Sequence, residues 1–240
     1  MPLPKINTPT YELELPSTGK KIKYRPFLVR EEKILIMALE SEDTKQISDA
    51  IKTVLSDCVM SRGVKVNDLS TFDIEYLFLN VRAKSVGETV EVNITCPDDG
   101  ETQVATEIFI DEIKVKKDPD HSNIIKLDDN LSLQMKYPSL NQFVESNFEV
   151  GESSSDVDKS LSVITSCINT VFNEEESWSA SDCTKKELKD FVDQMNTKQF
   201  KEVEKFFETM PKLSHTIKVK NPNTEVESEV VLEGLASFFN

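Results

Sequence analysis

The strongest constraint on the fold is the order in which two hydrophobic periods follow one another along the chain. Residues 11–25 alternate apolar and polar side chains around a turn at Pro16–Gly19, which is the two-residue period of a half-buried hairpin. Segments with helical spacing of apolar residues follow, and a second hairpin pattern at 89–110 ends the series. The second half of the chain repeats this order. The sequence therefore predicts an α+β fold.

The expected elements are parallel in the two halves. The first half is predicted to hold hairpins over 11–25 and 89–110 and helices over about 30–40, 44–60 and 70–86. The second half is predicted to hold hairpins over 124–137 and 216–232 and helices over about 140–148, 157–172, 184–195 and 197–208. A short linker rich in Gly, Ser and acidic residues is expected over 149–155.

Short matches between the halves indicate an internal duplication. Lys23–Tyr24 and Lys136–Tyr137 each end a hairpin just before a proline, and Val54–Val59 resembles Val163–Ile168. The alternative is that such short matches arise by chance.

Since the order of elements and the matched residues agree, we predict two tandem related α+β modules, residues 9–116 and 122–240. On this interpretation Cys58 and Cys167 are equivalent positions, and we expect both to be buried on helix faces, because a free cysteine packs as a small hydrophobic residue.

The acidic composition excludes several classes of partner. The 240 residues include 28 Lys and Arg against 43 Asp and Glu, so the formal net charge is −15 at pH 7. This charge gives the protein no electrostatic reason to bind nucleic acid or an anionic membrane. No apolar run approaches the roughly 20 residues of a membrane-spanning helix, and Met1–Lys5 lacks the apolar segment of a secretory signal. We therefore expect a soluble protein made in a cytoplasm.

One turn resembles half of a zinc site. Cys96–Gly100 has the form of the Cys-Pro-x-Cys-Gly knuckle of zinc ribbons, but Asp99 stands in place of the second cysteine, and the corresponding turn Asn221–Thr224 has no sulfur. A structural zinc site needs four ligands, mostly Cys or His. We therefore predict an ordinary turn at Cys96–Gly100, in which hydrogen bonds replace the metal. The acidic segment Asp118–Asp129 lacks the glycine and the glutamate of a calcium loop and is predicted to be a connector.

No pattern predicts catalysis or a bound cofactor. Only His121 and His215 could serve as histidine bases, and they lie far apart in the sequence, without a Gly-x-Ser-x-Gly motif or a glycine-rich phosphate loop. The sequence therefore predicts that the protein is not an enzyme and holds no metal or cofactor. A metal-binding or hydrolytic module is kept as the alternative of another class.

Exposed aromatic residues and hairpin turns are the candidate contacts for protein partners. Trp178 stands alone in a polar stretch, and Phe238 and Phe239 lie near the last residue of the chain. The alternative for the last two is that they pack into the protein's own core. Turn residues complete the set of candidates: Asp98, Asp99 and Asn223.

Three stretches of the chain resemble one family. Leu3–Phe27, Phe72–Glu88 and the pair of segments 206–215 and 232–239 are similar to the baseplate hub and hub-assembly proteins of T4-type bacteriophages. Members of that family often carry a Cys-Pro-x-Cys-Gly-like knuckle, from which this sequence departs at Asp99 and at Asn221–Thr224.

The resemblance implies a non-enzymatic protein of the central hub of a contractile tail baseplate. It would act through contacts with other phage baseplate hub proteins, in the host cytoplasm during assembly and in the tail baseplate of the virion. The alternative within the family is a transient assembly chaperone that the finished particle does not retain.

Overall fold

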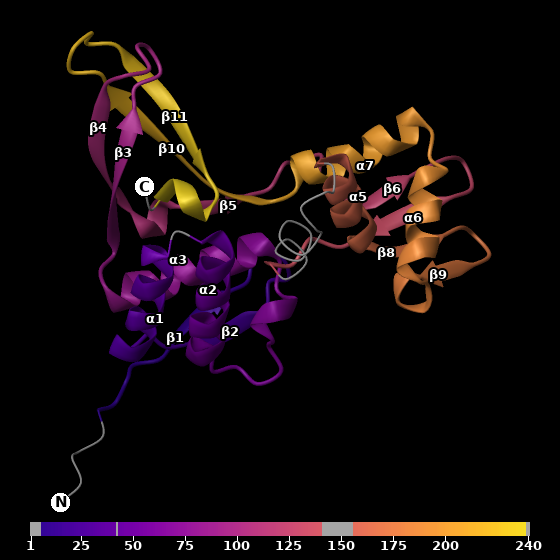
Figure 1. Cartoon of the computed structure of the whole chain (residues 1–240), viewed down its shortest axis with the longest axis horizontal. Coiled ribbons are helices and arrows are strands. Elements are labelled where there is room, and N and C mark those ends of the chain that lie inside the picture. Colours follow the sequence, from indigo (N-terminus) through magenta and orange to yellow (C-terminus); the bar gives the residue numbers. More distant parts are fainter. Residues whose placement is uncertain (1–5, 42, 141–155, 239–240) are drawn as a thin grey trace, which may run out of the picture. The chain divides into compact units, whose positions relative to one another are not determined.

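The computed structural model describes residues 6–41, 43–140 and 156–238 (Figure 1). The chain forms two compact units. Unit 1 comprises residues 1–116 and 212–240, and unit 2 comprises residues 117–211. Both helices and small antiparallel sheets are present, so the predicted α+β class is confirmed. Within the described residues no helix is long and apolar enough to cross a membrane.

The N-terminal part of unit 1 is a hairpin followed by helices. Its elements are β1 (Tyr11–Glu14), β2 (Lys21–Tyr24), α1 (Val29–Glu40), α2 (Thr44–Cys58), the 3-10 turn Val66–Asp68 and α3 (Thr71–Ser85). The carboxylate of Asp73, fully buried in the first turn of α3, accepts hydrogen bonds from the Ser70 hydroxyl (2.7 Å) and from the backbone N–H of Ser17 (3.0 Å). This carboxylate therefore ties the β1–β2 turn to the start of α3.

A second buried carboxylate fixes the start of α1. Glu31 has no exposed surface, and its oxygens accept hydrogen bonds from the backbone N–H of Leu28 (2.6 Å), Arg30 Nε (2.6 Å) and Arg25 Nη2 (3.1 Å). Burial alone would raise the pKa of Glu31, but the donors from Arg25, Arg30 and Leu28 outweigh it and lower the pKa to about 2. The first turn of α1 is therefore held by a buried carboxylate that pairs with two arginines.

The rest of unit 1 consists of two antiparallel sheets. Its elements are β3 (Thr89–Thr95), β4 (Gln103–Phe109), the 3-10 turn Ile110–Glu112, β5 (Lys114–Lys116), β10 (Lys212–Lys220), β11 (Glu227–Glu233) and the 3-10 turn η5 (Leu235–Phe238). One sheet is the β3–β4 hairpin, and the other has the strand order β11-β10-β5. The two long hairpins lie side by side (Figure 1).

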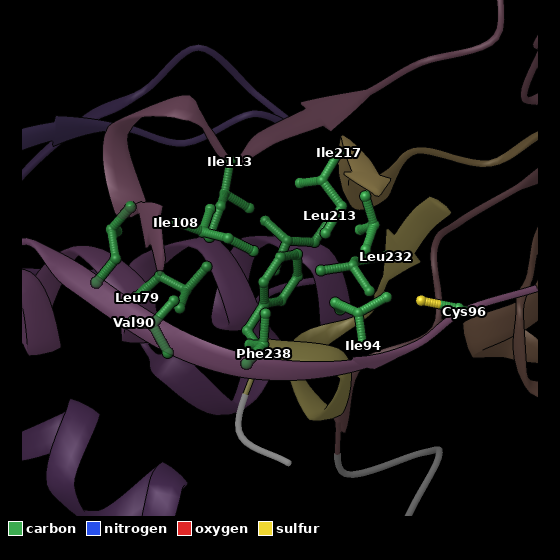
Figure 2. Packing of buried hydrophobic residues seen from close by; sticks show 13 residues of the cluster. Leu79, Val90, Ile94, Cys96, Ile108, Ile113, Leu213, Ile217, Leu232 and Phe238 are labelled. Atoms are coloured by element: carbon green, nitrogen blue, oxygen red, sulfur yellow. The ribbon is translucent and has the colours of Figure 1, made fainter. Parts of the chain in front are cut away.

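The space between these sheets is filled by one apolar cluster. Strand residues such as Val90, Ile108 and Leu213 pack with Leu79 of α3, and the ring of Phe238 lies among them with no exposed surface (Figure 2). One backbone conformation and one hydrogen bond position the turn that carries this ring. Gly234 takes a left-handed conformation (φ 73°), and the backbone N–H of Leu235 donates to Glu75 Oε1 at 3.3 Å.

Unit 2 packs helices on a four-stranded antiparallel sheet. Its strands are β6 (Ile124–Lys126), β7 (Ser132–Met135), β8 (Ile168–Phe172) and β9 (Ser177–Ser179), in that order across the sheet, and its helical elements are α5 (Asp156–Ser166), the 3-10 turn Ala180–Asp182, α6 (Lys185–Asp193) and α7 (Thr197–Thr209). A separate apolar cluster, which includes Leu133, Cys167 and Phe206, forms its core.

One predicted helix is wrong in its second part. The helix expected over 157–172 ends at Ser166, and residues 168–172 form β8, which pairs with β7 on one side and β9 on the other. Four of the five residues from Ile168 to Phe172 are β-branched or aromatic, which favours a strand once neighbours are available. The helix expected over 140–148 lies outside the described residues from position 141 onward.

The compact units differ from the predicted modules in the last hairpin. Residues 212–240 belong to unit 1, because β10 pairs with β5 at Lys212–Ser214, so the segment 122–240 is divided between the two units. Local parallels between the halves are present nonetheless. The backbone N–H of Arg25 donates to Cys58 O (3.0 Å) and that of Lys136 to Cys167 O (2.8 Å), and both cysteines are fully buried. The duplication itself stays a prediction.

The buried Glu31 makes stability depend on pH in a defined window. Its pKa is lowered from 4.5 to about 2, so the stabilisation by the carboxylate is fully present above pH 4.5 and is lost as the pH falls toward 2. We expect Glu31→Gln to lower the free energy of unfolding by about 2 kcal/mol at pH 7, because it removes the charge that neutralises two arginines. Urea unfolding of the unaltered chain and of Glu31→Gln between pH 2 and pH 7 measures this difference in the free energy of unfolding.

The matched control is Glu32→Gln, one residue further along the same helix. It should leave the stability and its pH dependence nearly unchanged. If Glu31→Gln and Glu32→Gln were equally stable at pH 7, the buried ion pair would not be a source of stability.

Candidate protein-interaction sites

The tips of the two long hairpins have the same backbone conformation. In one, the N–H of Gly100 donates to Cys96 O at 2.9 Å, and in the other the N–H of Glu225 donates to Asn221 O at 2.9 Å. The fifth residue of each turn is left-handed, with φ 69° at Gly100 and 61° at Glu225. Glu225 is the only residue other than glycine with positive φ in the described part of the chain. The turns at Cys96 and Asn221 are therefore structural counterparts, as the sequence pattern predicted.

The two tips meet through side-chain hydrogen bonds, and we refer to these residues as the tip cluster (Asp98, Asp99, Thr102, Asn221, Asn223 and Thr224). Asn221 is fully buried, and its Nδ2 donates to Asp98 Oδ1 (3.1 Å), Asp98 Oδ2 (3.0 Å) and Asp99 Oδ2 (2.8 Å). The Thr224 hydroxyl donates to Asp98, and Asn223 Nδ2 donates to Thr102 Oγ1 at 3.0 Å. One amide therefore joins both carboxylates of the opposite turn.

These contacts hold both carboxylates in their charged form. Hydrogen bonds from Thr224 and Asn221 lower the pKa of Asp98, and those from Thr102 and Asn221 lower the pKa of Asp99 well below its usual range. The neighbouring thiol shifts the other way, since burial and the charges of Asp98 and Asp99 raise the pKa of Cys96.

The donor set at the tips does not fit a structural zinc ion. The positions that a zinc ribbon would use are occupied by Cys96, Asp99, Asn221 and Thr224, which offer one thiol and one carboxylate already bound to N–H and O–H donors. Across residues 6–41, 43–140 and 156–238, no group of three or more His, Cys, Asp or Glu side chains could hold a metal ion. Hydrogen bonds thus join the turns that a metal joins in a zinc ribbon.

The other predicted contact residues are distributed differently. Trp178 lies in β9, the last strand of the unit 2 sheet, and 43% of it is exposed, so it is available to a partner. The prediction that Phe238 is a surface contact needs correction, because its side chain is enclosed in the core of unit 1. Phe239 lies outside the described residues. The core alternative that the sequence left open therefore holds for Phe238.

The sequence interpretation missed an exposed apolar surface on α1. Large side chains on this helix remain open to solvent, with Val29 at 66%, Ile36 at 48%, Met37 at 70% and Leu39 at 58% exposure. We refer to these four residues as the α1 apolar face. The signal was present in the sequence, because residues 34–39 are apolar at every position, more than a single packing face of a helix can bury. Exposed apolar groups of this kind are typical of protein-interaction sites.

Unit 2 contains a cavity of about 670 Å³ between β6 and α7. Part of the predicted connector Asp118–Asp129 lines it, including Asp120 and Asp128. Asp128 Oδ1 accepts the backbone N–H groups of Asn130 and Leu131, both at 2.8 Å, so this carboxylate stabilises its own turn. Two hydroxyls in its wall donate to backbone oxygens, that of Ser122 to Ile124 O (3.0 Å) and that of Thr209 to Lys205 O (2.7 Å).

The two histidines are in separate structural roles. His121 is stacked on Tyr137, and its ring nitrogens lie 3.0 Å from the hydroxyls of Thr209 and Tyr137. Burial lowers its pKa, and the charge of Lys117 adds to the effect. His215, on β10, lies 3.9 Å from a carboxylate oxygen of Glu112. The ring of His121 therefore links Thr209 of α7 to Tyr137.

Comparison with known proteins gives one match. The model of a protein family described as T4 bacteriophage base plate protein matches residues 8–240 of the chain. No curated protein and no solved structure matches it.

The tip cluster should contribute to stability without any metal. We expect Asn221→Ala to lower the free energy of unfolding by about 1–3 kcal/mol, because Asp98 and Asp99 lose the donor they share. The control Asn223→Ala removes only an exposed bond to Thr102 and should cost clearly less. Thermal unfolding with and without a chelator measures both effects. A fall in the midpoint on adding the chelator would contradict the metal-free interpretation.

Proposed function

The chain belongs to the family of T4 bacteriophage base plate proteins, and on that basis we propose that it is a structural or assembly protein of the central hub of a contractile phage tail baseplate. The observation that carries the proposal is the extent of the match, which covers residues 8–240 and so both compact units. Its partners are other phage baseplate proteins, as the family implies. It meets them in the host cytoplasm during assembly and in the tail baseplate of the virion.

We propose that the protein acts by surface contact rather than by catalysis. Several groups that could carry chemistry make hydrogen bonds within the fold, among them the buried carboxylates of Glu31 and Asp73 and the ring of His121, which supports this proposal. What the surface offers instead is apolar area suited to a partner. The α1 apolar face lies in unit 1, and Trp178 offers an aromatic anchor on unit 2.

A retained hub subunit is present in mature virions, whereas a transient assembly factor is absent from them. We expect peptides of this chain in mature virions purified away from free protein, because a hub subunit stays in the particle. Mass spectrometry of those particles measures it, with other baseplate proteins as the internal standard. If the chain is present in assembling baseplates but absent from mature particles, the assembly chaperone is the correct alternative.

A second prediction tests the contact surface directly. We expect Met37→Glu on the α1 apolar face to reduce baseplate assembly at least about tenfold in a complementation assay, because it places a charge in an apolar interface. The folded chain should tolerate it, since 70% of Met37 is exposed. Ser56→Glu, at an exposed position of α2, is the matched control and should assemble normally. Equal assembly by both variants would remove this face from the interface.

A further inference from the structure

Strand β11 is the outermost strand of its sheet and has one free edge. The strand order is β11-β10-β5, and β11 pairs with β10 along its whole length, from Glu227 opposite Lys220 to Glu233 opposite Ser214. Among the described residues no other strand is bonded to it. With seven residues, β11 is a long edge strand, and long unpaired edges are where further strands can add.

The register identifies the backbone groups on that edge. Asn221 N–H donates to Val226 O, and Gly234 N–H donates to Leu213 O, both at 2.9 Å, so these are hydrogen-bonded pairs of the antiparallel ladder. Such pairs recur at every second residue, and the residues between them turn their N–H and C=O away from the partner strand. Therefore Glu227, Glu229, Val231 and Glu233 direct their backbone groups to the free edge. Of these, Glu233 O is used by the Ser237 hydroxyl (2.6 Å).

The side chains of the same residues are exposed on the outer face of the sheet. Val231 is 55% exposed between two glutamates. On the paired side the glutamates meet lysines of β10, with Lys218 Nζ 3.5 Å from Glu229 and Lys212 Nζ 3.9 Å from Glu233. The β10 lysines approach these carboxylates from the paired side of β11. A strand added at the free edge would approach them from the opposite side. The edge thus combines three backbone sites with three exposed carboxylates, two of which already face a β10 lysine on the paired side.

The edge is held in place at both ends of the hairpin. The tip cluster anchors its far end through Asn221 and Thr224, and the N–H of Leu235 anchors its near end to Glu75. Leu232 is buried in the core of unit 1 beside Phe238 (Figure 2). A partner therefore meets a strand that is already ordered, which lowers the entropy cost of binding.

We propose that the free edge of β11 binds an extended segment of a partner protein that carries Lys or Arg at alternate positions, as an added strand. Backbone hydrogen bonds to Glu229 and Val231 would supply affinity, and basic side chains opposite the glutamates would supply selectivity. A second copy of β11 is disfavoured at this edge, because it would set glutamate against glutamate. The inference rests on the proposed assembly role, which calls for protein partners.

The test uses the full chain, labelled with ¹⁵N, and a synthetic peptide in which lysine and valine alternate. We expect the peptide to slow amide hydrogen exchange at Glu229 and Val231 at least about tenfold, with binding that weakens as salt is added. A peptide with glutamate in place of every lysine is the control and should give no protection. Equal protection by both peptides, or protection only at residues outside β11, would overturn the proposal.

A substitution at one backbone donor makes the test specific. Val231→Pro removes an N–H that does not bond to β10, so the β10–β11 ladder can stay intact, and we expect peptide affinity to fall at least about tenfold. Val231→Thr keeps the donor and should bind normally. Should Val231→Pro fail to fold, Glu229→Lys gives an independent answer, since it should weaken the lysine peptide and favour the glutamate peptide. Unchanged binding by Glu229→Lys would overturn the proposal.

The failure of this inference and that of the proposed function are distinguishable. If the chain is found in particles while the lysine peptide leaves β11 unprotected, the edge proposal is wrong and the hub role stands. If the peptide binds β11 while the chain is absent from both particles and assembling baseplates, the strand site stands and the hub role is wrong.

Discussion

Strand β10 is bonded on both of its edges, and the architecture of unit 1 depends on that double pairing. On one edge it carries β11, and on the other its first residues pair with Lys114–Lys116, almost a hundred positions earlier in the sequence. This second pairing returns the last hairpin to the N-terminal part of the chain and closes the apolar cluster between the two sheets. The ring of Phe238 then has a place to pack, because the 3-10 turn that carries it follows β11 directly.

The opposite end of the same hairpin is fixed by an amide rather than by a metal. Two turns with matching backbone conformations bring Asn221 against Asp98 and Asp99, and charged acceptors make the hydrogen bonds stronger than those between neutral groups. The buried side chain of Cys96 packs in the apolar cluster of unit 1. One amide and two carboxylates therefore join the two turns.

Local features of this fold could be predicted from the sequence, whereas the long-range ones could not. The hairpins and most helices follow from hydrophobic period and turn chemistry, which short segments encode by themselves. The helix predicted over 157–172 was wrong beyond Ser166, because its apolar residues are spaced as in a helix, whereas residues 168–172 are mostly β-branched or aromatic and form β8 between the neighbours β7 and β9. The pairing of β5 with β10 and the burial of Phe238 depend on contacts between distant segments. No short pattern records such contacts.

The acidic surface has two consequences for a protein whose strands leave open edges. Like charges opposite one another destabilise strand pairing, so glutamates along β11 oppose pairing between copies of this chain, whose net charge is −15. The same glutamates attract an extended segment of opposite charge. Because the backbone of β11 is already ordered, it loses little conformational entropy when that segment binds. Charge on an edge strand is commonly a protection against aggregation. Here the same glutamates give protection against aggregation and selectivity for a partner, because they repel an acidic strand and attract a basic one.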